Sequence, residues 1–127
     1  MRLKNIDADM MATALEPLLD QRNMVGYAAA RNARALTAAC ADFIKIRDDL
    51  IRDLGEKPVD ENGNQTGPER IGPDSPNFAE FMERITPIAE VEVDVDIFTL
   101  PENDVIGLMS GREILELDWM LTREDED

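Results

Sequence analysis

Four carboxylates at alternate positions are the residues of this 127-residue chain that could most plainly do chemistry. Between residues 90 and 97 an acid alternates with a β-branched residue, and the acids are Glu90, Glu92, Asp94 and Asp96. This period of two predicts a strand with one buried and one solvated face. Such a line of carboxylates can bind a basic protein surface, help to hold a hard cation, or only keep a sheet face in solvent and protect its edge from aggregation.

Metal binding is the weaker use of these oxygens. Alternate residues on a strand lie about 7 Å apart, too far for shared coordination of one cation without groups from elsewhere. Residues 60–64 (DENGN) begin like a calcium loop, but its sixth position is Gln65 rather than Gly and its twelfth is Ile71 rather than Glu. We therefore expect neither a metal site nor a cofactor.

The absence of histidine removes most catalytic chemistry. Without it, the common general base, the Ser/His and Cys/His nucleophile pairs and the His-containing zinc sites are all excluded. The single cysteine, Cys40, can form no disulfide within the chain, and its alanine neighbours predict a small buried residue. No Gly-rich phosphate-binding motif is present. We expect a protein that is not an enzyme, with a divalent-metal carboxylate enzyme as the alternative.

The charge is concentrated in the second half of the chain. Residues 1–63 hold 11 Asp/Glu against 9 Lys/Arg, whereas residues 64–127 hold 17 against 4, out of a net charge of −15. Phosphate contacts need clustered Lys and Arg, so this balance argues against direct binding to nucleic acid or to an anionic membrane. It favours a partner with a basic surface.

The elements that must position the acids predict an α+β fold in a single small domain over residues 1–127. The strand at 90–97 and a short strand within residues 1–6 predict a small antiparallel sheet, covered on one face by one long helix and two or three shorter helices. The long helix spans residues 25–54. Its alanine-rich first half leaves room for another helix to approach closely, either an earlier one or that of a second copy of the chain.

The shorter helices have recognisable ends. We expect one from Asp7 or Asp9 to about residue 20, stopped or kinked near Leu15 by Pro17, and a last one that starts with a capping box. A third should be capped by Ser75 and ended by Pro87. Trp119 should close the core. We expect a flexible Pro/Gly-rich loop at 56–76, with a hairpin around Asn62-Gly63, and an acidic tail at 123–127.

No stretch resembles a signal peptide or is long enough to cross a membrane, so the sequence predicts a cytoplasmic protein. Four segments are similar to a family of small proteins encoded by phages and prophages of Gram-positive bacteria and known as a domain of unknown function. They are residues 1–5 (MRLKN), 54–57 (LGEK) with 60–63 (DENG), 90–95 (EVEVDV) and 113–120 (EILELDWM). The resemblance implies a phage-related origin, hence a bacterial host, and two kinds of role: virion assembly or interference with a host system.

Three hypotheses follow. The first is a non-enzymatic inhibitor whose acids occupy the basic channel of a host nucleic-acid-binding defence protein, as a DNA mimic or anti-CRISPR protein does. The second is a phage virion assembly or chaperone-like component that uses the alanine-rich helix, and the third is the metal enzyme. For the first, the expected partner-binding residues are the four acids of the strand, reinforced by others: Glu90, Glu92, Asp94, Asp96, Glu102, Asp104, Glu113 and Glu116.

Overall fold

The computed structural model describes residues 1–123 and divides the chain into two compact units. The first unit contains Met1–Cys40 and the described residues from Glu92 onward, and the second is Ala41–Val91. The chain therefore leaves the first unit and returns to it at the acidic strand. The single domain expected over residues 1–127 stays a prediction, which one shared unfolding transition would support.

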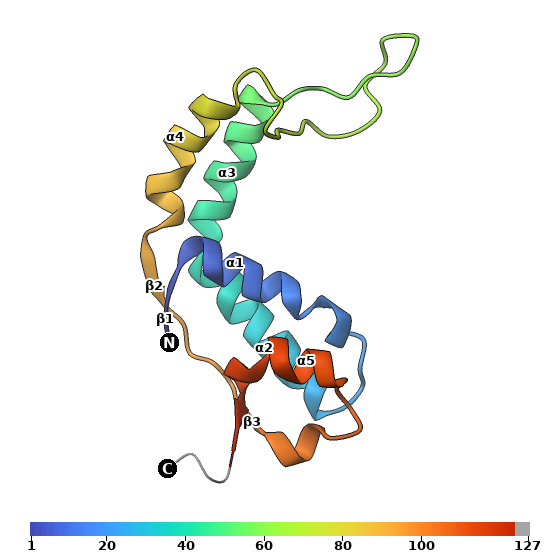
Figure 1. The fold of residues 1–127 in the computed structure, drawn as a ribbon, viewed down its shortest axis with the longest axis vertical. Coiled ribbons are helices and arrows are strands. Elements are labelled where there is room, and N and C mark those ends of the chain that lie inside the picture. The colour runs from blue at the N-terminus through green and yellow to red at the C-terminus, as the bar shows by residue number, and fades with distance from the viewer. Residues whose placement is uncertain (124–127) are drawn as a thin grey trace. The chain divides into compact units, whose positions relative to one another are not determined.

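The first unit combines helices with two small sheets (Figure 1). Helices α1 and α2 pack against each other, strands β1 and β2 pair antiparallel, and β3 and β4 pair parallel. Three short 3-10 helices, η1 to η3, complete it. In chain order the elements are β1 (Arg2–Lys4), α1 (Asn5–Ala14), η1 (Glu16–Leu18), α2 (Met24–Ala39), β2 (Glu92–Asp94), β3 (Leu100–Pro101), η2 (Glu102–Val105), α5 (Gly111–Glu116), η3 (Asp118–Met120) and β4 (Leu121–Thr122).

Small residues allow α1 and α2 to approach closely. Ala8 of α1 and Ala28 and Ala29 of α2 have no exposed surface. Gly26 lies in the first turn of α2, and a Cβ on it would fall 1.8 Å from the carbonyl oxygen of Gln21, so no larger residue fits there. Part of the alanine-rich face is thus buried within the first unit, which leaves less of it for a second copy of the chain.

The second unit consists of two helices and the loop that joins them. Helices α3 (Ala41–Leu54) and α4 (Phe78–Ala89) lie side by side (Figure 1). The loop is held by antiparallel bridges between Glu56 and Arg70 and between Val59 and Gln65. The expected hairpin is present at its tip, where Gly63 takes a φ of 81° that favours glycine.

The α+β class is confirmed, but the single long helix is wrong. Cys40 separates α2 from α3 with φ −108° and ψ 19°. It is buried as expected, and its thiol donates to the carbonyl oxygen of Leu36 at 3.1 Å, the same oxygen that its main-chain N–H uses. Side chains that bond back to the carbonyl four residues earlier tend to bend a helix, and the Cys40 thiol forms such a bond at the junction. The apolar spacing continues through Cys40, so the pattern contains no sign of the break.

Two predicted helix starts are also wrong. Helix α1 begins at Asn5, and Asp7 lies in its first turn. A carboxylate there stabilises the helix by its interaction with the helix dipole, but it does not cap the helix. Ser75 does not cap α4. Its hydroxyl accepts the N–H of Gly72 at 3.0 Å and closes a turn, and the N-cap position belongs to Asn77.

The sequence also predicts two helix ends at prolines and one helix start at a capping box. Pro17 stops α1 as expected, since the helix ends at Ala14 and a 3-10 turn follows. Pro87, by contrast, lies inside α4, which continues to Ala89. Pro87 has no N–H to donate to the carbonyl of Glu83, four residues earlier, yet the helix continues past it. The expected capping box is present at Ser110 and starts α5.

At the C-terminal end, Trp119 is half-buried, and its neighbours Leu117 and Met120 provide the fully buried side chains. The prediction of Trp119 as a core residue therefore holds only in part. Arg123 pairs with Glu102 at 3.3 Å. The remainder of the predicted acidic tail, residues 124–127, lies outside the described residues.

Candidate functional site

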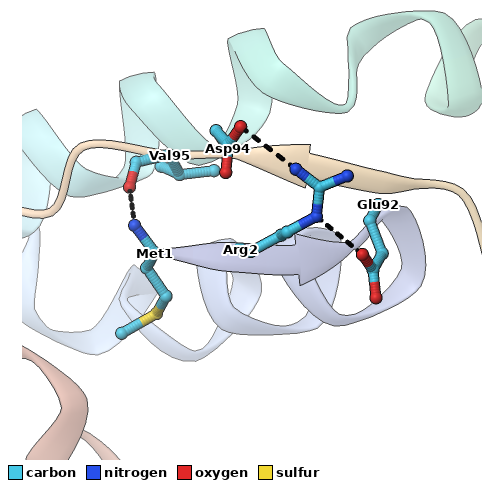
Figure 2. Close-up of polar contacts among 5 residues, drawn as sticks. All are labelled: Met1, Arg2, Glu92, Asp94 and Val95. Carbon is cyan, nitrogen blue, oxygen red and sulfur yellow. Dashed lines mark hydrogen bonds and ion pairs between the residues drawn. The ribbon is translucent and has the colours of Figure 1, made fainter.

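The acidic strand is held in place by β1. Arg2 lies opposite Asp94, Leu3 opposite Val93 and Lys4 opposite Glu92. Beyond them, the amino group of Met1 donates to the carbonyl oxygen of Val95 at 2.8 Å, and the N–H of Val95 donates back at 2.8 Å (Figure 2). The strand assigned to β2 is shorter than the predicted span of 90–97, because regular pairing covers only three residues of it.

The alternation of buried and exposed side chains holds over the part of the acidic segment in the first unit. Val93 is half-buried and Val95 is 3% exposed, whereas Glu92, Asp94 and Asp96 are exposed. We call these three acids the acidic row. The inward direction predicted for Val91 is wrong, since 52% of its surface is exposed. Val91 lies just after α4, before the strand begins.

Glu90 does not belong to the acidic row. It is the C-terminal cap residue of α4 and a member of the second unit. The N–H of Glu90 donates to the carbonyl oxygen of Thr86 at 3.1 Å, so the helical pattern extends through it. The alternation of acidic and apolar residues continues across the end of α4, so the sequence does not reveal where the helix stops. The predicted line of four carboxylates is therefore a row of three.

One cation, Arg2, lies between two acids of the row. Its Nε is 2.7 Å from Oε2 of Glu92, and its Nη1 is 3.4 Å from Oδ2 of Asp94 (Figure 2). The hydrogen bond that Arg2 donates to Glu92, followed by the charge of Asp94, raises the pKa of the Arg2 guanidinium. All three side chains are more than half exposed, so solvent screens these pairs and they add little to stability.

Arg2 was missed as a site residue. The signal was present in the sequence, because residues 2–4 read basic, apolar, basic, which complements an acidic strand that reads acid, apolar, acid. Only the register between β1 and β2 reveals that the two patterns face each other. Asp96 lies beyond this pairing and forms no ion pair among residues 1–123.

The far end of the acidic segment is anchored by Asn32 of α2, which has no exposed surface. Its side-chain amide donates to the carbonyl oxygen of Phe98 at 2.9 Å and accepts the N–H of Phe98 at 2.8 Å. The guanidinium of Arg31 lies 4.8 Å from the centre of the Phe98 ring, and Tyr27 packs edge-on against that ring with the centroids 5.6 Å apart. The acidic row is therefore fixed at both ends.

The reinforcing acids divide into two kinds. Glu102 pairs with Arg123, and Glu113 accepts the N–H of Ser110 at 2.8 Å as part of the capping box. Asp104 in η2 and Glu116 at the end of α5 are exposed and form no ion pair in the described part of the chain. The latter two thus resemble Asp96, the member of the acidic row that forms no ion pair in the described residues.

Metal ligands are not gathered anywhere in the described residues. No group of three His, Cys, Asp or Glu side chains could hold an ion there. In the loop that begins like a calcium site, one carboxylate oxygen of Asp60 accepts the N–H groups of Asn62 at 2.9 Å and Asn64 at 3.0 Å. This oxygen therefore holds the turn together.

Residues 1–123 contain no helix with both the length and the apolar character needed to cross a membrane. Comparison with known proteins gives no relative for the chain: no protein-family model matches it, and neither a curated protein nor a solved structure is similar to it.

Proposed function

We propose that this chain is a phage-encoded, non-enzymatic protein that binds a basic surface of a host nucleic-acid-binding protein in the bacterial cytoplasm and so inhibits it. The observation that carries the proposal is the acidic row. Glu92, Asp94 and Asp96 are exposed on one face of a segment that is fixed by β1 at one end and by Asn32 at the other. Rigid charges lose little conformational entropy when a partner binds them.

The spacing of the row limits how far DNA mimicry can go. Alternate strand residues lie about 7 Å apart, whereas one strand of DNA carries a charge about every 3.4 Å of its axis. The row thus has about half that linear charge density before Arg2 is counted. The net charge of −15 and the unneutralised Asp104 and Glu116 have to provide the rest of the attraction.

A protein that binds the basic channel of a nucleic-acid-binding protein should compete with the nucleic acid for that channel. The test is to capture proteins from host lysate with the tagged chain at low and at high salt, and then to measure whether the chain displaces a labelled DNA duplex from each protein captured. We expect a DNA-binding protein that is lost at high salt and that releases its duplex. Captured proteins that keep their duplex bound would contradict the proposal.

The second candidate is a virion assembly or chaperone-like component. Two side chains of the first unit favour it, since Leu115 of α5 is 78% exposed and Ile106 is 68% exposed. Apolar side chains exposed to this degree can anchor a protein interface. Under this reading, Leu115→Ser should abolish capture of virion proteins and high salt should not, the reverse of the pattern expected for the acidic row.

A further inference from the structure

The outer edge of β2 has main-chain groups without partners. In an antiparallel pair, hydrogen-bonded pairs of residues alternate with non-hydrogen-bonded pairs. Met1 and Val95 exchange two bonds, so the register makes Leu3 and Val93 the next hydrogen-bonded pair. The N–H and C=O groups of Glu92 and Asp94 must then point away from β1.

Nothing in residues 1–123 pairs with these outward groups. The sheet contains β1 and β2 alone, and β3 and β4 form a separate one. No hydrogen bond is formed by the main chain of Glu92 or Asp94 on that side. An edge of this kind can take an extended segment of another protein as a further strand.

The side chains specify which segment fits. Glu92 and Asp94 present carboxylates that are 53% and 76% exposed on one face, and Val93 between them points to the other face. A neighbouring strand places its side chains opposite them at Cβ separations of about 4.5–5.5 Å, where opposite charges attract. The complementary segment therefore alternates basic and apolar residues.

β1 is an example of such a segment within the chain itself. Its residues Arg2, Leu3 and Lys4 read basic, apolar, basic and lie opposite Asp94, Val93 and Glu92. Asp96, one alternate position further on, is exposed and has no ion-pair partner in the described residues. A second copy of the chain is a poor occupant, because each copy pairs its own β1 and carries a charge of −15.

We propose that the outer edge of β2 binds an extended basic–apolar–basic segment of its partner as a third strand. This inference rests on the proposed function, since it states how the basic partner is recognised. Main-chain bonds to Glu92 and Asp94 provide the pairing, and the carboxylates of the acidic row select alternating Lys or Arg side chains.

The test uses synthetic peptides with the full chain. The parent is acetyl-Val-Arg-Val-Lys-Val-Arg-Val-amide, and two derivatives carry N-methyl groups on the odd or on the even residues. A fourth peptide has the same composition with its three cations adjacent. Only one edge of an added strand faces β2, so one methylated derivative should lose at least tenfold in affinity and the other should bind like the parent. The peptide with adjacent cations should bind more weakly than the parent.

Two variants locate the pairing on the protein. Asp94→Pro removes the outward N–H and the carboxylate, whereas Asp94→Ala removes the carboxylate alone, and proline is tolerated at an edge where its missing N–H faces outward. We expect Asp94→Pro to bind the parent at least fivefold more weakly than Asp94→Ala does. Protection of the Val95 amide from hydrogen exchange checks that both variants keep the β1–β2 pair.

The outcomes separate this inference from the proposed function. Equal affinity for both methylated derivatives, or equal affinity of the two Asp94 variants, overturns strand addition, as does the absence of peptide binding. Displacement of DNA from host proteins can still occur in each of those cases, and the proposed function then stands. Methylation-sensitive binding without any displacement of DNA supports the edge and contradicts the proposed function.

Discussion

The acids of α3 and those of β2 are balanced in different ways. In α3, Asp49 pairs with Lys45 at 3.0 Å and with Arg52 at 2.7 Å, four and three residues away. In β2, Glu92 and Asp94 share the one cation Arg2, which lies 90 and 92 positions away in the chain. Asp49 is thus neutralised by two neighbours on its own helix, whereas two acids of the strand share one distant cation.

This difference determines how much uncompensated charge a helix or a strand can offer to a binding partner. Helical neighbours at three and four residues meet on one face, so a mixed sequence compensates its own charge. A strand has no such neighbours, and its compensation depends on which other strand lies beside it. The acidic row is therefore the better candidate for an external basic partner.

The largest effect should come from charging the inward side of the acidic strand. Val95→Asp places a carboxylate at a position that is 3% exposed, and we expect it to lower the free energy of unfolding by about 3–5 kcal/mol. Val91→Asp is the matched control. At a position that is 52% exposed it should cost less than about 1 kcal/mol. Urea unfolding of both variants measures the difference, and equal losses would show that the inward face is misassigned.

Removing the anchor of the acidic segment should have the next largest effect. Asn32→Ala leaves the N–H and C=O of Phe98 without their partners, at a cost of about 1–3 kcal/mol for each group that stays buried. Urea unfolding and hydrogen exchange of the Phe98 amide measure it. Asn103→Ala, at an exposed position of the same unit, should change stability by less than about 0.5 kcal/mol. A Phe98 amide that remains protected in Asn32→Ala would exclude the anchor.

Much of the fold could be predicted because its signals are local. The Ser110 capping box, the stop at Pro17 and the loop turn at Gly63 each depend on residues within a few positions. The break at Cys40 could not be predicted, since the apolar spacing continues through it. Proline alone likewise does not fix a helix end, since Pro17 follows the end of α1 whereas Pro87 lies inside α4.

The candidate site could be predicted only as a row of exposed acids. Its alternation was readable, but its neutralisation by Arg2 and its anchoring by Asn32 join residues that are 66 to 92 positions apart. The position of Glu90 outside the row could not be predicted either. Helix α4 continues up to Glu90, and an alternation with a period of two does not reveal where a helix ends.

Arg2→Gln should sharpen the contrast between strand and helix. Arg2 competes with an external cation for Glu92 and Asp94, so its removal should speed association with a basic partner severalfold at low salt. Arg112→Gln changes the net charge equally at an exposed position of α5 and should have a smaller effect. Stopped-flow association rates measure both. A slower rate for Arg2→Gln would mean that Arg2 helps to form the binding surface.

The smallest predicted effect is on the pH dependence of stability and concerns the ion pairs of Asp49 in α3. Hydrogen bonding from Lys45, with a further contribution from Arg52, lowers the pKa of Asp49. A lowered folded pKa stabilises the folded state above the ordinary value of about 3.9, and this stability is lost as the pH falls through the folded value. Asp49→Asn should therefore flatten slightly the dependence of unfolding free energy on pH below about 4. Its exposure and solvent screening keep the change small. Identical pH profiles would show that the pair contributes nothing.

The most direct test of the acidic row is the rate of association with the captured DNA-binding protein as a function of ionic strength. Asp94→Lys/Asp96→Lys should slow association about tenfold at low salt, with the difference vanishing as the Debye length falls to about 3 Å at 1 M salt. Asp53→Lys/Glu83→Lys makes the same change of net charge at exposed positions in the second unit and should slow it far less. Equal rates for the two double variants would contradict the assignment of the acidic row as the binding surface.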